Sequence, residues 1–290
     1  MLLKDALKSA ISALTSAGVG SPRMNAETLL MFALSCDRAY LFAHPERELT
    51  PQEEINYQEE IAQRTIGIPT QYITGHQEFW GMDLIVSPAV LIPRPETEHV
   101  VEAALSLIRD GGRASPQGAN LRIVDVGTGS GCIALALAKE LPQADIHATD
   151  ISRAALEIAR ANATRHRLDA RIHFQETDLL QGFEPRTFDL IVSNPPYVGE
   201  SEVDEVQLEV RKHEPRNAVF AGPTGLEVIE RLIPQARAML KPGGSLIMEM
   251  SGTIAEGVKL LLASWTELRA INDLQGIPRV AIATKSALAP

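Results

Sequence analysis

The sequence predicts an α/β fold in which a parallel sheet, covered by helices on both faces, follows a small all-helical domain. Two observations predict it. Residues 1–75 carry apolar side chains at helical spacing, whereas from Leu121 onward short apolar runs alternate with amphipathic stretches. Alternating strands and helices are typical of a parallel sheet. A chain of 290 residues, 45% of them hydrophobic, is long enough for two domains with a sizeable core.

The first domain, residues 1–75, is expected to be a bundle of three helices. The first helix has its apolar residues on one stripe and ends near Gly18. The second is expected at 26–34. The third begins after Thr50 and Pro51, because a threonine hydroxyl can accept a hydrogen bond from the first turn and proline suits the first helical position.

A β-hairpin at 76–90, centred on Gly81, is expected to link this bundle to a second domain at 91–290. The second domain starts with a proline-stiffened segment and a helix from about Val100, followed by a loop at 110–120. The strands and helices expected after the loop lie at 121–126, 132–141, 144–149, 154–166, 171–175, 188–193, 226–240 and 245–250. A strand pair at 268–272 and 280–284 is expected to close the sheet.

Charge and composition argue against several classes of function. The formal net charge is −10, whereas proteins that grip nucleic acid usually present a basic face. No apolar run approaches the roughly 20 residues needed to cross a bilayer, and the N-terminus lacks the pattern of a signal peptide. With Cys36 and Cys132 as the only cysteines, we expect no disulfide framework and a cytoplasmic location. The histidines show no metal-ligand spacing, so no metal is expected.

A glycine-rich loop joins the first strand of the second domain to the next helix. Its sequence is Gly127-Thr128-Gly129-Ser130-Gly131. Glycines let the backbone approach a ligand at the edge of an α/β sheet. A dinucleotide fingerprint would need Gly or Ala where Cys132 stands, and G-x-G-x-G preceded by Asp125 is typical of enzymes that use S-adenosylmethionine. Asp150, at the end of the second strand, can accept both ribose hydroxyls of an adenosine. A plain tight turn and NAD binding are the alternatives, and Cys132 is expected to be a buried helix residue.

Asn194, Pro195, Pro196 and Tyr197 directly follow the strand at 188–193, at the same edge of the sheet. The two prolines remove backbone donors, which leaves a cluster of acceptors that includes the Asn194 side-chain oxygen. Such a cluster suits a planar NH₂ group, whose N–H bonds align better with the acceptors as the nitrogen becomes tetrahedral. Tyr197 offers a flat face to hold that group. The sequence therefore predicts methyl transfer to a planar amino nitrogen, with a rigid turn without chemistry as the alternative.

Four runs of the sequence are distinctive. They are Leu91-Ile-Pro-Arg-Pro-Glu-Thr-Glu98, Asp125-Val-Gly-Thr-Gly-Ser-Gly131, Ser193-Asn-Pro-Pro-Tyr197 and His213-Glu-Pro-Arg216. Through them the chain resembles the HemK/PrmC family, protein-(glutamine-N5) methyltransferases that act on peptide chain release factors. The resemblance implies a helical N-terminal domain, expected to recognise the substrate protein, a β-hairpin linker and a seven-stranded, Rossmann-like S-adenosylmethionine-dependent methyltransferase domain. It also implies methylation of the glutamine in the Gly-Gly-Gln loop of release factors.

The resemblance also implies roles for individual residues. The cofactor would contact Gly127, Thr128, Gly129, Ser130, Gly131, Asp150, Leu179 and Asn194. The catalytic group would be Asn194, Pro195, Pro196 and Tyr197. Leu179 stands where some members carry an aromatic residue, so apolar contact would replace stacking on the adenine. The segment 94–97 is expected to border the cofactor pocket, with a capped helix start as the alternative reading of Glu96 and Glu98. Arg64 stands alone where relatives often carry two basic residues.

Two other functions remain open. An adenine-N6 methyltransferase on DNA or RNA would share the amino group and the tetrapeptide, but it would need a basic groove and base flipping. A non-catalytic module that binds translation factors would keep the cofactor loop without needing Asn194. We expect the partner to be a release factor, with no direct contact to nucleic acid or membrane, and the chain to be a monomer.

Overall fold

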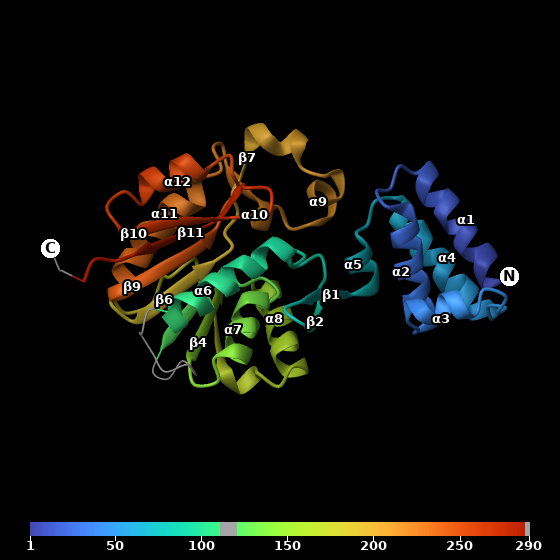
Figure 1. Cartoon of the computed structure of the whole chain (residues 1–290), viewed down its shortest axis with the longest axis horizontal. Coiled ribbons are helices and arrows are strands. Elements are labelled where there is room, and N and C mark those ends of the chain that lie inside the picture. The colour runs from blue at the N-terminus through green and yellow to red at the C-terminus, as the bar shows by residue number, and fades with distance from the viewer. Residues whose placement is uncertain (111–120, 288–290) are drawn as a thin grey trace. The chain divides into compact units, whose positions relative to one another are not determined.

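The computed structural model describes residues 1–110 and 121–287 (Figure 1). The chain divides into two compact units. The first comprises Met1–His76 together with Gln207–His213, and the second comprises Gln77–Val206 and Glu214–Pro290. The first unit thus includes a short segment from the second half of the chain, which the division expected from the sequence does not contain. The loop expected at 110–120 lies outside the described residues, apart from its first residue.

The first unit is built from helices around one apolar core. They are α1 (Leu3–Ser16), α2 (Pro22–Leu34), α3 (Arg38–Ala43), α4 (Pro51–Thr65), α5 (Thr70–Thr74) and α9 (Leu208–His213). Three of them, α1, α2 and α4, confirm the helices predicted from the sequence. The Thr50 hydroxyl accepts a hydrogen bond from Glu53 N at 3.3 Å, and the Glu53 carboxylate accepts one from Thr50 N at 2.9 Å. This capping box explains why α4 begins where the sequence predicts.

The predicted hairpin is formed by β1 (His76–Phe79) and β2 (Met82–Ile85). Trp80 and Gly81 at its turn both have positive φ, 54° and 65°, as a two-residue turn between twisted strands requires. Phe79 and Leu84 are buried in the core of the second unit, which anchors the hairpin there. A 3-10 helix, η1 (Pro95–Thr97), and α6 (Glu98–Asp110) follow.

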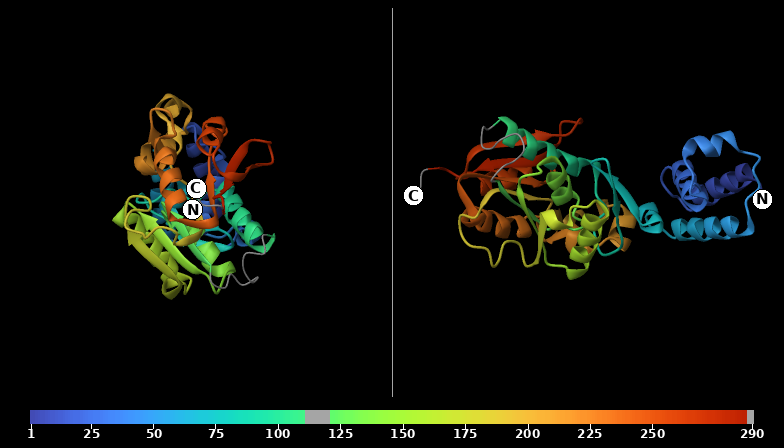
Figure 2. Two further views of the ribbon diagram at one scale, coloured as in Figure 1. Left: turned by 90° about the vertical axis from the view of Figure 1, so that its left-hand side faces the viewer. Right: turned by 90° about the horizontal axis from the view of Figure 1, so that it is seen from below.

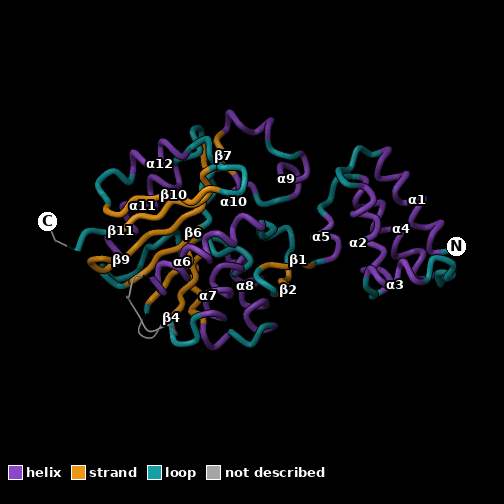
Figure 3. The backbone as a smooth tube through the Cα atoms, viewed as in Figure 1, coloured by secondary structure: helices purple, strands orange, loops and turns teal. Residues whose placement is uncertain are grey.

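The second unit contains a sheet of seven strands, in the order β10-β11-β9-β6-β3-β4-β5 (Figure 3). The strands are β3 (Arg122–Val126), β4 (Asp145–Asp150), β5 (Ile172–Glu176), β6 (Phe188–Ser193), β9 (Leu240–Glu249), β10 (Thr266–Asn272) and β11 (Pro278–Thr284). The first five run parallel, whereas β10 and β11 pair antiparallel with each other and β11 pairs antiparallel with β9. The seven strands and the closing strand pair are confirmed.

Helices cover both faces of the sheet, as the alternating pattern predicts (Figure 2). They are α6, α7 (Cys132–Glu140), α8 (Arg153–Arg165), α11 (Glu227–Met239) and α12 (Ala255–Leu261). Neighbouring strand residues point to opposite faces: Ile123 packs in one core with α6, α7 and α8, whereas Val124 packs in a second core with α11 and α12. Both faces of the central strands are therefore buried, which accounts for their nearly continuous apolar sequences.

The segment between β6 and α11 holds short elements that the sequence did not predict. They are β7 (Val198–Gly199), η3 (Glu200–Glu205), α9, α10 (Arg216–Val219) and β8 (Phe220–Gly222), and a further 3-10 turn, η2 (Asp169–Arg171), precedes β5. β7 and β8 form a two-stranded parallel sheet. In the described ranges, no helix is both long and apolar enough to cross a membrane.

Candidate active site

A cavity of about 320 Å³ lies in the second unit, where residues that follow β3, β4 and β6 come together. This is the point at which the strand order reverses, because β4 lies on one side of β3 and β6 on the other. Of the residues predicted to form the site, those lining the cavity are Gly127, Thr128, Gly129, Ser130, Asp150, Leu179, Asn194 and Pro196. Gly131, Pro195 and Tyr197 are not among the lining residues.

The glycines of the loop after β3 have two different tasks. Gly127 and Gly129 have φ of 73° and 56°, and a Cβ atom on either would meet no atom within 4 Å. They therefore leave an open edge at which a ligand can approach the backbone. Gly131 has φ of 86°, and a Cβ atom there would overlap the Leu135 side chain and lie 3.2 Å from Ala159 Cβ. Gly131 thus lets α7 pack closely against α8.

Asp150 ends β4 with its carboxylate fixed by the backbone on both sides. Its Oδ2 accepts a hydrogen bond from Gly129 N at 2.9 Å, and its Oδ1 accepts one from Ser152 N at 2.8 Å. Burial raises the pKa of Asp150, and these two backbone donors act in the opposite direction. Each oxygen keeps a second lone pair for a ligand hydroxyl.

Asp125 precedes the glycine loop and is almost completely buried. Its Oδ2 accepts hydrogen bonds from Thr128 Oγ1 at 2.6 Å and from Ala134 N at 3.2 Å, which shapes the loop. Its Oδ1 is buried and has no hydrogen-bond partner in the described part of the chain. Burial raises the pKa of Asp125 to about 7 and that of the neighbouring Cys132 thiol to about 12. Cys132 is thus a buried helix residue, as expected.

The tetrapeptide after β6 is tied to two residues that are distant in the sequence. Asn194 Nδ2 donates a hydrogen bond to Thr97 Oγ1 at 3.1 Å, and Thr97 Oγ1 donates one to Glu249 Oε2 at 2.7 Å. The Tyr197 hydroxyl donates to Glu249 Oε1 at 2.9 Å, and burial raises the pKa of Tyr197. Thr97 also lines the cavity, so this part of the segment 94–97 borders the pocket.

Glu249 belongs to this network, although it was not among the site residues predicted from the sequence. The sequence does contain a sign of it, because Glu249 is the one acid in the apolar run at 246–250, which spans the end of β9. A carboxylate in a buried strand is costly unless it is hydrogen-bonded, and such residues often serve a site.

Two of the distinctive motifs meet in the structure. Arg94 donates a hydrogen bond to Glu214 Oε1 at 2.5 Å, and Ile92 N donates to Glu214 Oε2 at 3.2 Å. Glu98 accepts a hydrogen bond from Trp80 N at 2.8 Å in the first turn of α6, which supports a structural reading of this acid.

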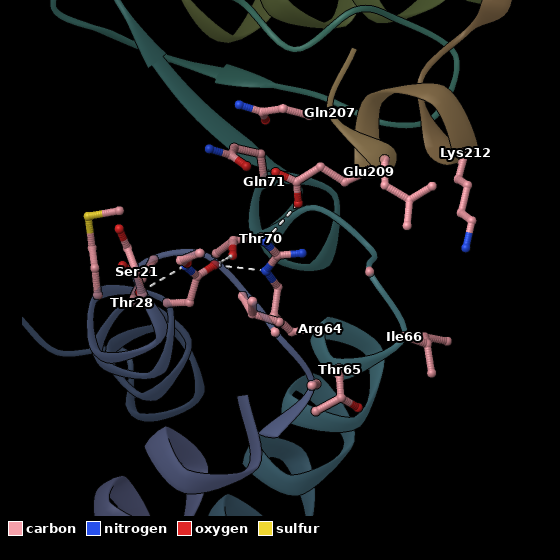
Figure 4. Close-up of a pocket in the computed structure, with 18 residues that line it drawn as sticks. Ser21, Thr28, Arg64, Thr65, Ile66, Thr70, Gln71, Gln207, Glu209 and Lys212 are labelled. Atoms are coloured by element: carbon pink, nitrogen blue, oxygen red, sulfur yellow. Dashed lines mark hydrogen bonds and ion pairs between the residues drawn. The ribbon is translucent and has the colours of Figure 1, made fainter. Parts of the chain in front are cut away.

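A second, larger cavity of about 840 Å³ lies within the first unit (Figure 4). Arg64 borders it and is buried; Arg64 Nε donates to Asn25 Oδ1 at 2.8 Å, and its guanidinium pairs with Glu209 at 2.7 Å. Thr70 Oγ1 donates to the same Asn25 oxygen at 2.5 Å. Because these polar groups satisfy one another, Arg64 is a structural residue that fixes α9 to the helices of its unit.

A glycine loop facing a cavity, an acid at the end of the next strand and this strand order define the class of S-adenosylmethionine-dependent methyltransferases. Residues 5–75 match the family model of the PrmC N-terminal domain, and residues 114–212 match that of the methyltransferase small domain. The chain is 54% identical to the release factor glutamine methyltransferase of Koribacter versatilis, over 98% of this chain and 99% of that protein. It is 41% identical to that of Rhodopirellula baltica, over 91% and 89%. The chain therefore belongs to the family of release factor glutamine methyltransferases, which confirms the resemblance.

Solved structures with the same fold are more distant in sequence. The hMettl16 catalytic domain, in complex with MAT2A 3′UTR hairpin 1, aligns with a TM-score of 0.53 over 79% of this chain and 81% of that chain. The identity is 20%, so this likeness concerns the fold alone.

Proposed function

We propose that the chain transfers a methyl group from S-adenosylmethionine to the side-chain amide nitrogen, N5, of the glutamine in the Gly-Gly-Gln loop of peptide chain release factors. The observation that carries this proposal is Asn194 at the cavity wall, with Nδ2 engaged by Thr97 and Oδ1 left to accept from a substrate NH₂. The names of the relatives support the substrate protein.

The residues around the cavity fit the cofactor. Gly127 and Gly129 leave the open edge that a ligand needs, and the cavity volume is in the range of small-molecule sites. Asp150 would bind the ribose hydroxyls, and Leu179 would give the adenine an apolar contact. When bound, S-adenosylmethionine supplies a methyl group that is attached to a positively charged sulfur. Loss of the methyl group converts this sulfonium to a neutral thioether, which is a good leaving group.

Methyl transfer would form a bond between the amide nitrogen and the methyl carbon, and the bond between that carbon and the sulfur would break. The nitrogen then loses a proton to water, so no general base is required. Asn194 Oδ1 would accept an N–H of the substrate amide and stabilise the positive charge that develops on nitrogen. Because this hydrogen bond improves as the nitrogen becomes tetrahedral, it favours the transition state over the ground state. Pro196 lines the cavity and would help to confine the amide.

We also propose that the chain acts as a monomer in the cytoplasm, where release factors work, with residues 1–75 recognising the substrate and without direct contact to nucleic acid. The net charge of −10 supports the last point. Light scattering of the eluting protein tests the monomer, and methylation of a naked release factor, free of ribosome and RNA, tests the independence from nucleic acid.

The decisive experiment incubates the purified protein with S-adenosylmethionine and an unmodified bacterial release factor, and maps the product by mass spectrometry. We expect one added methyl group on the glutamine of the Gly-Gly-Gln loop. A release factor with that glutamine replaced by alanine is the control. Methylation of DNA or RNA in place of the release factor would move the assignment to adenine. If the protein binds the cofactor but methylates neither the release factor nor DNA nor RNA, it is a non-catalytic binding module.

The Asn194→Ala variant tests the mechanism in the same assay. We expect turnover to fall on the order of 10²–10³-fold, as on losing one oriented polar contact to a developing charge. Cofactor affinity, measured by calorimetry, should change far less. Near-normal turnover in this variant would exclude the proposed role of Asn194.

A further inference from the structure

A chain of hydrogen bonds, buried at its centre and partly buried at its two ends, leads from Asn194 at the cavity through Thr97 to Glu249 and Tyr197. Asn194 Nδ2 donates to Thr97 Oγ1, Thr97 Oγ1 donates to Glu249 Oε2, and the Tyr197 hydroxyl donates to Glu249 Oε1. These residues come from three places in the fold: η1, the end of β6 and the end of β9. We propose that Thr97 and Glu249 are positioning residues that determine which end of the Asn194 side-chain amide faces the substrate. This inference rests on the proposed function, in which Asn194 contacts the substrate amide.

The direction of each hydrogen bond follows from the number of protons. A carboxylate only accepts, and a threonine hydroxyl has a single proton to donate. Because Thr97 donates that proton to Glu249, its oxygen can only accept from Asn194. Asn194 must therefore turn its NH₂ group toward Thr97, which leaves Oδ1 on the other side of the amide.

The opposite orientation of Asn194 is unfavourable at both ends. Asn194 Oδ1 would then face Thr97 Oγ1, and two acceptors would meet beside a threonine that is only 1% exposed. Its NH₂ group would face the substrate, and an NH₂ group cannot accept a hydrogen bond from the substrate NH₂. By accepting the Thr97 proton, Glu249 thus selects, through Thr97, a substrate group that donates hydrogen bonds.

Burial makes this chain of hydrogen bonds rigid. Thr97 is 1% exposed and Glu249 is 2% exposed, so solvent does not compete for their hydrogen bonds. Glu249 lies between Met248 and Met250, which are themselves buried, and an apolar residue would suit its place in the strand. A buried carboxylate costs free energy even when it is hydrogen-bonded, so a role in the site explains its presence better than stability does.

A matched pair of variants tests the proposal on the full-length chain. Thr97→Val keeps the shape of the side chain and removes the hydroxyl, whereas Thr97→Ser keeps the hydroxyl. We expect Thr97→Val to lower kcat for release-factor methylation by about 10–100-fold with little change in KM, because the lost interaction acts in the transition state. Thr97→Ser should restore kcat to within a few-fold of the parent protein. Equal kcat in Thr97→Val and the parent would overturn the proposal, as would a loss confined to thermal stability.

A double-mutant cycle separates positioning from an independent contribution. If Thr97 acts through Asn194, Thr97→Val in the Asn194→Ala background should lower kcat by less than about twofold further. Effects that multiply would show that Thr97 acts on its own and would contradict the proposal.

A measurement without release factor keeps this inference separate from the proposed function. The side-chain NH₂ signal of Asn194 can be assigned in a ¹⁵N-labelled sample from its loss in Asn194→Ala. We expect it at a shift typical of a hydrogen-bonded amide in the parent protein and in Thr97→Ser, and displaced and exchanging faster with water in Thr97→Val. An unchanged signal in Thr97→Val would overturn the inference even if the release factor is methylated. A displaced signal together with no release-factor methylation would uphold the inference and reject the proposed substrate.

Discussion

Ionising a buried acid costs free energy, and Asp125 is one buried acid of this protein in which that cost is visible. Burial raises its pKa to about 7 in the folded protein, whereas the ordinary value is 3.8. The folded state therefore holds the proton more strongly than the unfolded state does. The stability that comes from this proton is fully present below about pH 4 and is lost as the pH rises to about 7.

The Asp125→Asn variant tests this linkage, because asparagine keeps an oxygen for Thr128 and Ala134 and cannot ionise. We expect its free energy of unfolding, relative to that of the parent protein, to increase by about 1–3 kcal/mol between pH 5 and pH 8, because only the parent loses stability over this range. Urea denaturation of the cofactor-free protein at the two pH values measures it. A difference that does not depend on pH would show that Asp125 is ionised at both.

At the scale of elements, the loop between β3 and α7 uses glycine in two ways: Gly131 allows close packing, and Gly129 leaves space at the cavity. Gly131→Ala introduces a Cβ atom that overlaps Leu135 in a left-handed conformation, so we expect a loss of about 2–4 kcal/mol of stability. Gly129→Ala meets no atom within 4 Å and should cost about 1 kcal/mol of backbone strain. Its Cβ would instead narrow the cavity edge, so cofactor affinity should fall at least about tenfold. Thermal unfolding and calorimetry on both variants check this contrast, and equal stability losses would contradict it.

The sequence predicted those elements whose local pattern agrees with their final environment. Thr50 and Pro51 mark the start of α4, and the apolar run at 188–193 is β6 with the predicted bounds. The short elements between β6 and α11 were not predictable in this way, because α9 and η3 have no fully buried side chain. Short helices without an apolar stripe depend on contacts that no local pattern contains.

The candidate site shows the same limit. The glycine loop and the tetrapeptide are each a continuous run of sequence, and the fold brings part of each to one cavity: residues 127–130 of the loop, and Asn194 and Pro196 of the tetrapeptide. Glu249 and Thr97 meet only because β9 lies beside β6 and η1 lies next to both, and they are 152 residues apart. No local pattern in a single sequence predicts a contact between two residues this far apart in the chain.

At the scale of the whole molecule, the chain leaves the second unit after Val206, contributes α9 to the first unit and returns at Glu214. The segment that joins the first unit begins ten residues after Tyr197, and Glu214, the acid that binds Arg94, directly follows it. Within the first unit, Arg64 helps to hold α9 through its ion pair with Glu209. The lone arginine at this position therefore has a structural role.

We expect Arg64→Ala to lower the free energy of unfolding by about 2–3 kcal/mol, because it removes a buried side chain together with its hydrogen bond to Asn25 and its ion pair with Glu209. Gln63→Ala is the matched control: its side chain is exposed on the same helix and should change stability by less than about 0.5 kcal/mol. Hydrogen exchange should then show amides of α9 exchanging faster in Arg64→Ala, while those of β3 and β6 keep their protection. If protection of α9 is unchanged, other contacts hold this segment, and Arg64 serves only the packing of α4 against α2.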